Sequence, residues 1–165
     1  MDKKTVSQDD SVVSGTQLDL FIYTLDEINS IDNINDFVQI YDAKIVKDTD
    51  NVAGKLIMSV NDHIFKSSEK SEGEKNNLKS WMIKMIRRAE QSDIDGLFRY
   101  HWVLTDSLEI YFILRNMYYF GPKKSITYLR NHDLTAYMLF ERVLKTVDCQ
   151  CLKEWITYVI ADEVD

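Results

Sequence analysis

HWVLTDSLEIYFILRNMYYFGPKK, residues 101–124, decides the fold, because this stretch predicts one long and very apolar helix. Asp106 and Glu109 lie three residues apart in the middle of the predicted helix, and Arg115 follows them. A carboxylate within an apolar helix is costly to desolvate unless it is paired or hydrogen-bonded. The two acids are therefore either structural charges or parts of a site.

Helical periodicity, at about 100° per residue, divides this helix into two stripes that both carry large apolar groups. One comprises Arg99, Trp102, Asp106, Glu109 and Ile113, and the opposite one Leu97, His101, Leu104, Leu108, Phe112 and Arg115. We therefore expect the helix to be buried on two sides at the centre of a bundle, with His101 as a hydrogen-bonded core residue. Two interpretations of the acids stay open. They bond to Tyr, Arg or Lys of neighbouring helices, or one lines a cleft as a general base.

The patterns on either side of this helix predict a mainly α protein, an up-and-down helical bundle preceded by a short β/α leader. The predicted segments are a strand at 17–24, a helix at 25–38, a hairpin at 39–50, a polar loop or frayed helix end at 67–76 and helices elsewhere from residue 51 onward. Pro122 marks the end of the central helix and the start of the next. We divide the chain into a flexible terminus (1–16), a β/α region (17–50) and a helical bundle (51–165).

Composition restricts the possible partners. The chain has 165 residues, of which 45% are hydrophobic, and this suits one well-filled core. A net charge of -7 argues against a nucleic-acid partner. The polar start MDKKTVSQDD is not a signal peptide, and no apolar run reaches the roughly 20 residues of a membrane span. We expect a cytoplasmic protein without a membrane partner, in which the isolated C-x-C of Cys149 and Cys151 is reduced and holds no zinc.

Taken as a whole, the chain resembles the C-terminal part of bacterial nucleotidyltransferases of the aminoglycoside (kanamycin) adenylyltransferase type. The residues that carry the resemblance lie between positions 17 and 129, in the order QLDLFIYT, NDFVQIYDAKIVKDTD, FRYHWVLTDSLEIYFILRN and YYFGPKKSITYL. The resemblance implies an enzyme that transfers AMP from ATP and Mg²⁺ to the hydroxyl of a small-molecule acceptor. A C-terminal helical bundle would shape the acceptor pocket.

The same resemblance implies roles for individual residues. Glu109 occupies the place of the general base, with Asp106 as a second substrate-facing carboxylate. Asp19 occupies the place of a strand carboxylate that helps to hold the metal. The candidates for substrate binding are Trp102, Tyr111, Arg115, Lys123 and Lys124. The two lysines follow FGP at a helix start, where phosphate or an acidic partner binds readily, although a solvated lysine pair is the commoner outcome.

Two parts of the family pattern are absent, namely the Gly-Ser motif and the metal-binding acid pair. SDID, residues 92–95, matches that acid pair in letters, but it follows the helical segment WMIKMIRRAEQ. Ser92 or Asp93 is therefore interpreted as a helix N-cap, with Asp95 in the first turn. We expect the isolated chain to bind neither ATP nor Mg²⁺ and to be inactive alone. Its expected partners are a missing N-terminal catalytic domain or a second copy in a homodimer.

A second class of function is a non-catalytic binding or dimerisation module, because bundles of this kind also resemble HEPN domains. Catalytic HEPN RNases carry a His four to six residues after an Arg and a polar residue. Arg115 and Asn116 begin that pattern, but Phe120 and Gly121 stand where the His would be. RNase activity is therefore not expected.

Overall fold

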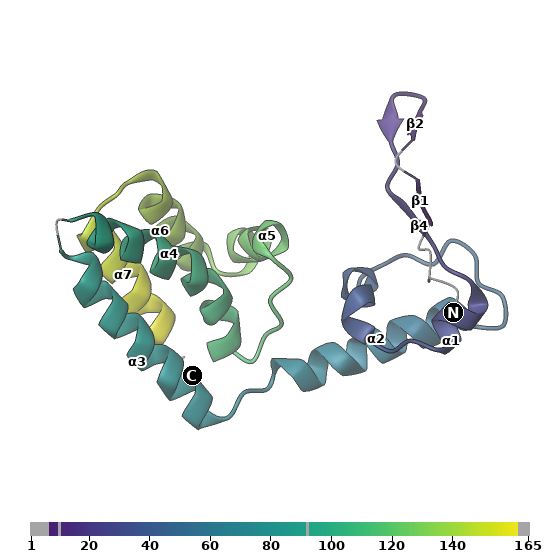
Figure 1. The fold of residues 1–165 in the computed structure, drawn as a ribbon, viewed down its shortest axis with the longest axis horizontal. Helices are drawn as coiled ribbons and strands as arrows, with labels where there is room; N and C mark the ends of the chain where they lie inside the picture. The colour runs from purple at the N-terminus through teal and green to yellow at the C-terminus, as the bar shows by residue number, and fades with distance from the viewer. Residues whose placement is uncertain (1–6, 10, 92, 162–165) are drawn as a thin grey trace. The chain divides into compact units, whose positions relative to one another are not determined.

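The computed structural model describes residues 7–9, 11–91 and 93–161 and is mainly helical, with a short strand leader (Figure 1). The predicted fold class, a helical bundle preceded by a short β/α leader, is confirmed. The chain divides into two compact units, Met1–Asp62 and His63–Asp165, here called the N-terminal unit and the helical unit. No helix in the described part of the chain combines the length and apolar content that a membrane span requires.

Two nested antiparallel ladders begin the N-terminal unit. β1 (Ser7–Asp9) pairs with β4 (Leu20–Ile22), and β2 (Val12–Val13) pairs with β3 (Thr16–Gln17). The turn between β2 and β3 places Ser14 and Gly15 at φ of 52° and 81°. Positive φ at both central residues is the geometry that follows the twist of a two-residue hairpin. Residues 1–6 and 10 of the expected flexible terminus lie outside the described residues.

The predicted helix at 25–38 is shorter than expected. α1 (Leu25–Asn29) is capped by Thr24, whose Oγ1 accepts from the Glu27 N–H while the Glu27 carboxylate accepts from the Thr24 N–H. This reciprocal capping box satisfies two main-chain donors. After a break, the chain continues as the 3₁₀ helix η1 (Ile34–Ile40).

The predicted hairpin at 39–50 is wrong. η1 occupies the start of this segment, and residues 41–50 form turns and bends. The polar residues at its end serve the next helix instead. Asp48 accepts from the N–H groups of Ala53 and Gly54, both at 3.0 Å, and these bonds lower the pKa of its carboxyl. The alternating residues at 39–50 therefore belong to the segment that leads into the N-terminus of the next helix.

α2 (Val52–Ser68) confirms the predicted four-residue spacing of apolar positions, and Val60 on that stripe is fully buried. The boundary between the two units lies within this helix. The polar segment 67–76, expected as a loop or frayed helix end, contains the end of α2, a break at 69–71 and the start of the next helix. α3 (Glu72–Ala89) begins there with a second capping box, formed by Ser71 and Glu74.

The core of the helical unit lies between α3, α4 (Ile94–Leu114), α6 (Leu134–Lys145) and α7 (Cys149–Ile160) (Figure 1). α7 contacts each of the other three, and α3 contacts α4. α5 (Pro122–His132) adds Leu129 to this core and packs on α6. Trp155 is fully buried at the centre. Its ring lies 5.0 Å from that of Phe140, and its Nε1 donates to Ser107 Oγ at 2.7 Å. A buried indole N–H with a partner fixes the packing of α7 against α4.

The central helix ends well before Pro122, where the sequence predicts its end. α4 stops at Leu114, and residues 115–121 form a connector in which Asn116 has a φ of 53° and Gly121 a φ of 81°. Pro122 then occupies the first turn of α5, where a missing N–H has no cost. The chain therefore turns on the two positive-φ residues. Pro122 marks the start of the next helix as predicted, but it does not mark the end of the central helix, which lies at Leu114.

Candidate functional site on the central helix

Asp106 and Glu109 lie on the accessible side of α4, one turn apart. Glu109 is exposed and Asp106 is half-buried. Asp106 Oδ2 accepts from Trp102 Nε1 at 2.8 Å, so an indole of its own helix, one turn earlier, is its partner. The sequence predicted Tyr, Arg or Lys as structural partners, and for Asp106 the structure gives Trp102 instead. The expectation that α4 is buried on two sides is wrong. Its buried residues lie along one broad face that includes Tyr100, Ser107 and Tyr111.

Tyr119 lies in the electrostatic field of these acids. Its phenol belongs to the connector at 115–121, and its ring centroid is 6.1 Å from that of Phe112. Burial first, and then the charges of Glu109 and Asp106, raise the pKa of Tyr119. The phenol therefore keeps its proton and can donate a hydrogen bond beside the two carboxylates. Sequence analysis missed this role because it expected the central helix to continue through residue 119.

Trp102 is the centre of an aromatic cluster next to the acids. Its ring lies 6.0 Å from Trp81 of α3 and 5.9 Å from Phe98. The Arg99 guanidinium lies 5.4 Å from the centre of the indole and pairs with Asp95 at 3.3 Å. Phe98 and Trp102 are both exposed. We call Phe98, Trp102, Asp106, Glu109 and Tyr119 the α4 face.

Tyr111 and Arg115 belong to a different cluster, at the C-terminal end of α4. Tyr111 is buried, and its OH donates to Asp133 Oδ2 at 2.6 Å. The Tyr158 OH donates to the same carboxylate at 2.8 Å. Arg115 lies 3.9 Å above the Tyr111 ring and donates to the main-chain oxygen of Val159 at 3.3 Å. The structure therefore assigns these two predicted substrate-binding residues to contacts between α4, α6 and α7.

The contacts of this cluster keep the Tyr111 phenol protonated and the Asp133 carboxyl ionised. Burial, followed by the bond to Asp133, raises the pKa of Tyr111 well above its usual range. Burial raises the pKa of Asp133, but the hydrogen bonds from Tyr111, the Ala136 N–H and Tyr158 outweigh it and hold that pKa below the usual value. Asp133 also caps α6. Sequence analysis missed it, although an Asp directly before an apolar helical run is an N-cap signal.

The remaining candidates are exposed. Lys123 and Lys124 lie in the first turn of α5, with Lys124 Nζ 5.5 Å from the centre of the Phe120 ring. Asp19 lies between β3 and β4 of the N-terminal unit. His101 is exposed, so the expectation of a core histidine is wrong. Among the described residues, no group of three or more His, Cys, Asp or Glu is arranged to hold a metal ion.

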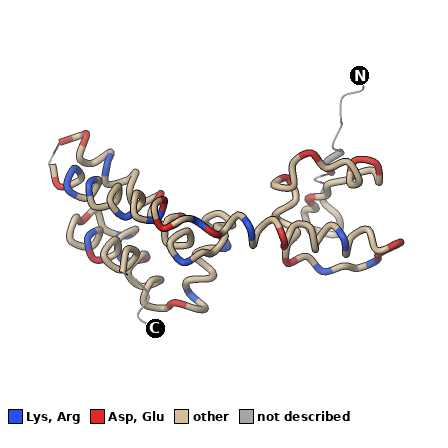
Figure 2. Tube along the Cα trace, turned by 90° about the horizontal axis from the view of Figure 1, so that it is seen from below, with Lys and Arg blue, Asp and Glu red and all other residues tan. Residues whose placement is uncertain are grey.

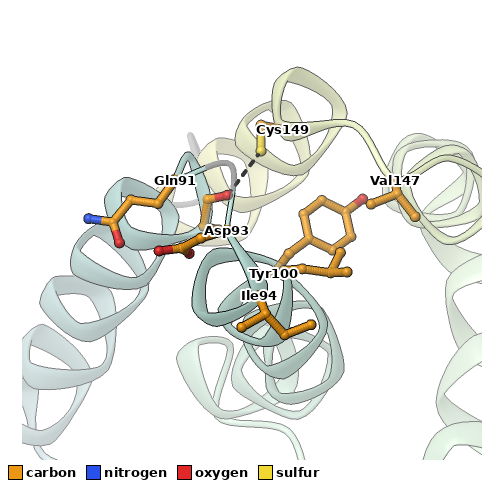
Figure 3. A pocket seen from close by; sticks show the side chains of 8 residues that line it. Gln91, Asp93, Ile94, Tyr100, Val147 and Cys149 are labelled. Atoms are coloured by element: carbon orange, nitrogen blue, oxygen red, sulfur yellow. Dashed lines mark hydrogen bonds between the residues drawn. The ribbon is translucent and has the colours of Figure 1, made fainter.

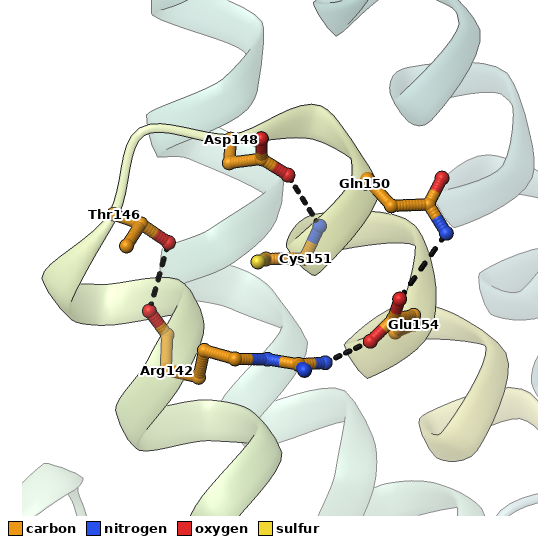
Figure 4. Close-up of polar contacts among 6 residues, drawn as sticks. All are labelled: Arg142, Thr146, Asp148, Gln150, Cys151 and Glu154. Atoms are coloured by element: carbon orange, nitrogen blue, oxygen red, sulfur yellow. Dashed lines mark hydrogen bonds and ion pairs between the residues drawn. The ribbon is translucent and has the colours of Figure 1, made fainter.

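The SDID motif and the cysteines have structural positions. Asp93 is the N-cap of α4, with its Oδ1 accepting from the Gly96 N–H at 2.8 Å, as one of the two alternatives predicted. Ser92 lies outside the described residues. Cys149 and Cys151 are half-buried free thiols in the first turn of α7. Asp148 caps that turn by accepting from the Cys151 N–H at 2.8 Å (Figure 4).

A partly exposed ion pair joins α6 to α7 in the same region. The Arg142 guanidinium of α6 pairs with the Glu154 carboxylate of α7, and Gln150 donates to the other oxygen of Glu154 at 3.2 Å (Figure 4). Elsewhere in the helical unit, acidic and basic residues are interspersed along the helices (Figure 2). The acids of the α4 face therefore lie within a mixed charge pattern.

No family model matches the chain, and neither a curated protein nor a solved structure matches it.

Proposed function

We propose that this chain is the acceptor-binding part of a nucleotidyltransferase-like protein that transfers AMP from ATP to the hydroxyl of a small molecule. The observation that carries the proposal is the position of Glu109, which is exposed on α4 one turn from the half-buried Asp106. An accessible carboxylate can reach the proton of a bound hydroxyl, as a general base must. Within this proposal the protein acts in the cytoplasm, where ATP is supplied.

Each residue of the α4 face has a defined role in the proposed reaction. Glu109 takes the proton of the acceptor hydroxyl, whose oxygen attacks the α-phosphorus of ATP while pyrophosphate leaves. Asp106, oriented by Trp102, supplies a second negative charge, and the neutral Tyr119 phenol donates a hydrogen bond to the acceptor. The exposed rings of Trp102 and Phe98 pack against its apolar surface.

Among the described residues, Asp19 is not part of any group of three possible metal ligands. The proposal therefore assigns ATP and Mg²⁺ to a separate nucleotide-binding domain. The strand leader supports this assignment. Leu20, Phe21 and Ile22 are successive strand residues, so they point to alternating faces, and all three are exposed. Strands that are apolar on both faces are typical of sheets covered by helices on both sides. The leader therefore has the character of one part of a larger α/β sheet.

Calorimetric titration tests the proposal. We expect the chain to bind members of an aminoglycoside panel but not ATP with Mg²⁺, and Glu109→Gln to weaken acceptor binding at least about fivefold (about 1 kcal/mol). Glu141→Gln is the matched control, because it removes the same charge from α6, where Glu141 pairs with Lys145. Equal affinity of the two variants, or no acceptor binding at all, contradicts the proposal. Binding of ATP contradicts the assignment of the nucleotide to another domain.

One observation favours a second candidate, the non-catalytic dimerisation module. Ile94 and Phe98, one turn apart on α4, are 82% and 60% exposed, and exposed apolar groups of this kind often mark an interface. If this candidate holds, sedimentation equilibrium shows a dimer that Phe98→Asp dissociates and Glu109→Gln leaves intact. A monomer at all concentrations tested rules this candidate out.

A further inference from the structure

A cavity of about 410 Å³ lies in the helical unit, beside the start of α4 (Figure 3). The turn between α3 and α4 forms one wall, and the loop between α6 and α7 forms the other. Its apolar lining consists of Ala89, Ile94, Leu97, Tyr100, Val147 and Cys149. Leu97 and Glu109 are twelve residues apart on α4, or about 18 Å along the helix. The cavity is therefore distant from Glu109, although Phe98 of the α4 face lies one turn from the lining residue Ile94.

Hydrogen bonds hold the walls of this cavity in place. The Tyr100 OH donates to the main-chain oxygen of Thr146 at 2.7 Å and accepts from the Asp148 N–H at 3.4 Å. The Cys149 thiol donates to the main-chain oxygen of Ala89 at 3.4 Å, which joins the two walls (Figure 3). A cavity whose walls are bonded to each other is formed before any ligand arrives, as small-molecule sites usually are.

Glycine makes the tight turn beside the cavity possible. A Cβ at Gly96 would overlap the main-chain oxygen of Gln91 and lie 2.8 Å from its carbonyl carbon. Only a residue without a Cβ allows the start of α4 to approach the end of α3 so closely.

The side chains of Ile94 and Val147 lie at the mouth of the cavity, where they are 82% and 68% exposed. The mouth is therefore as apolar as the lining.

The charges around the cavity select against anions. The Asp93 carboxylate lies in the wall, together with the neutral Gln91 amide. The pKa of the Cys149 thiol is raised, first by burial and then by the charges of Glu90 and Asp148. Lys153 pairs with Glu90 and offsets its charge, so the Asp93 carboxylate in the wall is the group that disfavours a carboxylate, sulfonate or phosphate. The neutral thiol adds no further charge to the lining.

We propose that this cavity is a binding site for a small uncharged aromatic ligand. The apolar lining and mouth supply the driving force, and the Tyr100 ring gives an aromatic molecule a preferred orientation. The cavity volume lies in the range of about 300–1,000 Å³ that is common for small-molecule sites. This assignment does not depend on the acceptor site of α4.

Two fluorescent probes with the same ring system test the proposal on the full chain. N-phenyl-1-naphthylamine is uncharged, and 8-anilino-1-naphthalenesulfonate is the same molecule with an added sulfonate. We expect saturable fluorescence enhancement for the uncharged probe and at least tenfold weaker binding of the sulfonate. Absence of saturable enhancement, or equal affinity for both probes, overturns the proposal.

Variants at exposed positions localise the probe without disturbing the fold. Ile94→Asp and Val147→Asp each place a charge at the mouth, and we expect each to weaken binding of the uncharged probe at least tenfold. Met138→Asp and Phe21→Asp are matched controls, since both residues are exposed apolar side chains outside the cavity lining. We expect them to leave the affinity unchanged. If the controls weaken binding as much as the mouth variants, the probe binds elsewhere and the proposal fails.

A thiol measurement places the ligand independently of affinity. In the Cys151→Ser variant the remaining thiol is Cys149, which lines the cavity. We expect the uncharged probe at saturating concentration to slow alkylation of Cys149 by iodoacetamide at least fivefold. An unchanged alkylation rate would show that the cavity is empty when the probe is bound.

Discussion

The two units of this chain use the same local signals but differ in what those signals support. Both contain capping boxes, Thr24 with Glu27 in the N-terminal unit and Ser71 with Glu74 in the helical unit. In the helical unit the capped helix packs into a continuous core around Trp155. In the N-terminal unit the capped helix α1 has no buried residue. The difference shows that correct local chemistry defines an element, whereas a shared core stabilises it.

Truncation of Trp155 is expected to cause the largest loss of stability among the variants compared here. Trp155→Ala leaves a cavity in the core and removes the donor to Ser107, and it should lower the free energy of unfolding by about 3–5 kcal/mol. Phe21→Ala, on the exposed leader strand, should change it by less than about 0.5 kcal/mol. Urea titration followed by far-ultraviolet circular dichroism measures both. Similar losses for both variants would mean that the leader shares the core.

The outcome for the sequence predictions follows the same division. The apolar spacing of α2 and the helix start at Pro122 are strong local signals, and both are confirmed. The hairpin at 39–50 is wrong because short alternating runs carry little information when their polar residues also serve as helix caps, as Asp48 does. Sequence alone indicated which stripe carries Asp106 and Glu109. It did not show that this stripe is accessible, because burial depends on which helices pack against α4.

For the candidate site, the sequence predicted which residues share a face of α4 but not which of them contact residues distant in the chain. Trp102, Asp106 and Glu109 were expected together from helical spacing, and the structure brings them together on one face. Tyr119 was missed because its position depends on where α4 ends. Tyr111 could not be separated from the site by spacing, since its contact with Asp133 joins residues 22 positions apart.

Gly96 offers the next largest effect, with a matched glycine in the same unit. Gly96→Ala places a methyl group against the main chain of Gln91 and should cost about 1–3 kcal/mol of unfolding free energy. Gly73→Ala, in the exposed first turn of α3, has only Ser71 Oγ at 4.0 Å and should stabilise by about 0.4–1 kcal/mol. Thermal unfolding of the two variants gives the comparison. A neutral Gly96→Ala would show that the approach of α3 and α4 is looser than described.

Asp133 predicts a pH dependence that belongs to the helical unit. Its pKa in the folded chain lies below its usual value, so its contribution to stability is fully present above about pH 4 and is lost as the pH falls through the folded pKa. Asp133→Asn should cost about 1–3 kcal/mol at pH 7, and less at pH 3. Urea titrations at the two pH values measure this difference. A cost that is independent of pH would contradict the assigned hydrogen bonds from Tyr111 and Tyr158.

The smallest expected effects are those of removing each of the two capping boxes. Ser71→Ala should destabilise the chain by about 1 kcal/mol, because α3 is part of the core. Thr24→Ala should change the same transition by less than about 0.5 kcal/mol. All three tryptophans, Trp81, Trp102 and Trp155, lie in the helical unit, so tryptophan fluorescence reports its unfolding. Equal effects would mean that the two units unfold together.

The helical unit folds around its own core, and our central proposal is that a further domain covers the apolar strands of the N-terminal unit. Hydrogen exchange of the full chain, followed by mass spectrometry of peptides, tests it most directly. We predict slow exchange in α3, α4, α6 and α7, with protection close to the global stability, and exchange within seconds to minutes in β4 and α1. Equally slow exchange in β4 and α1 would contradict the claim, because it would show that the leader is already stabilised within this chain.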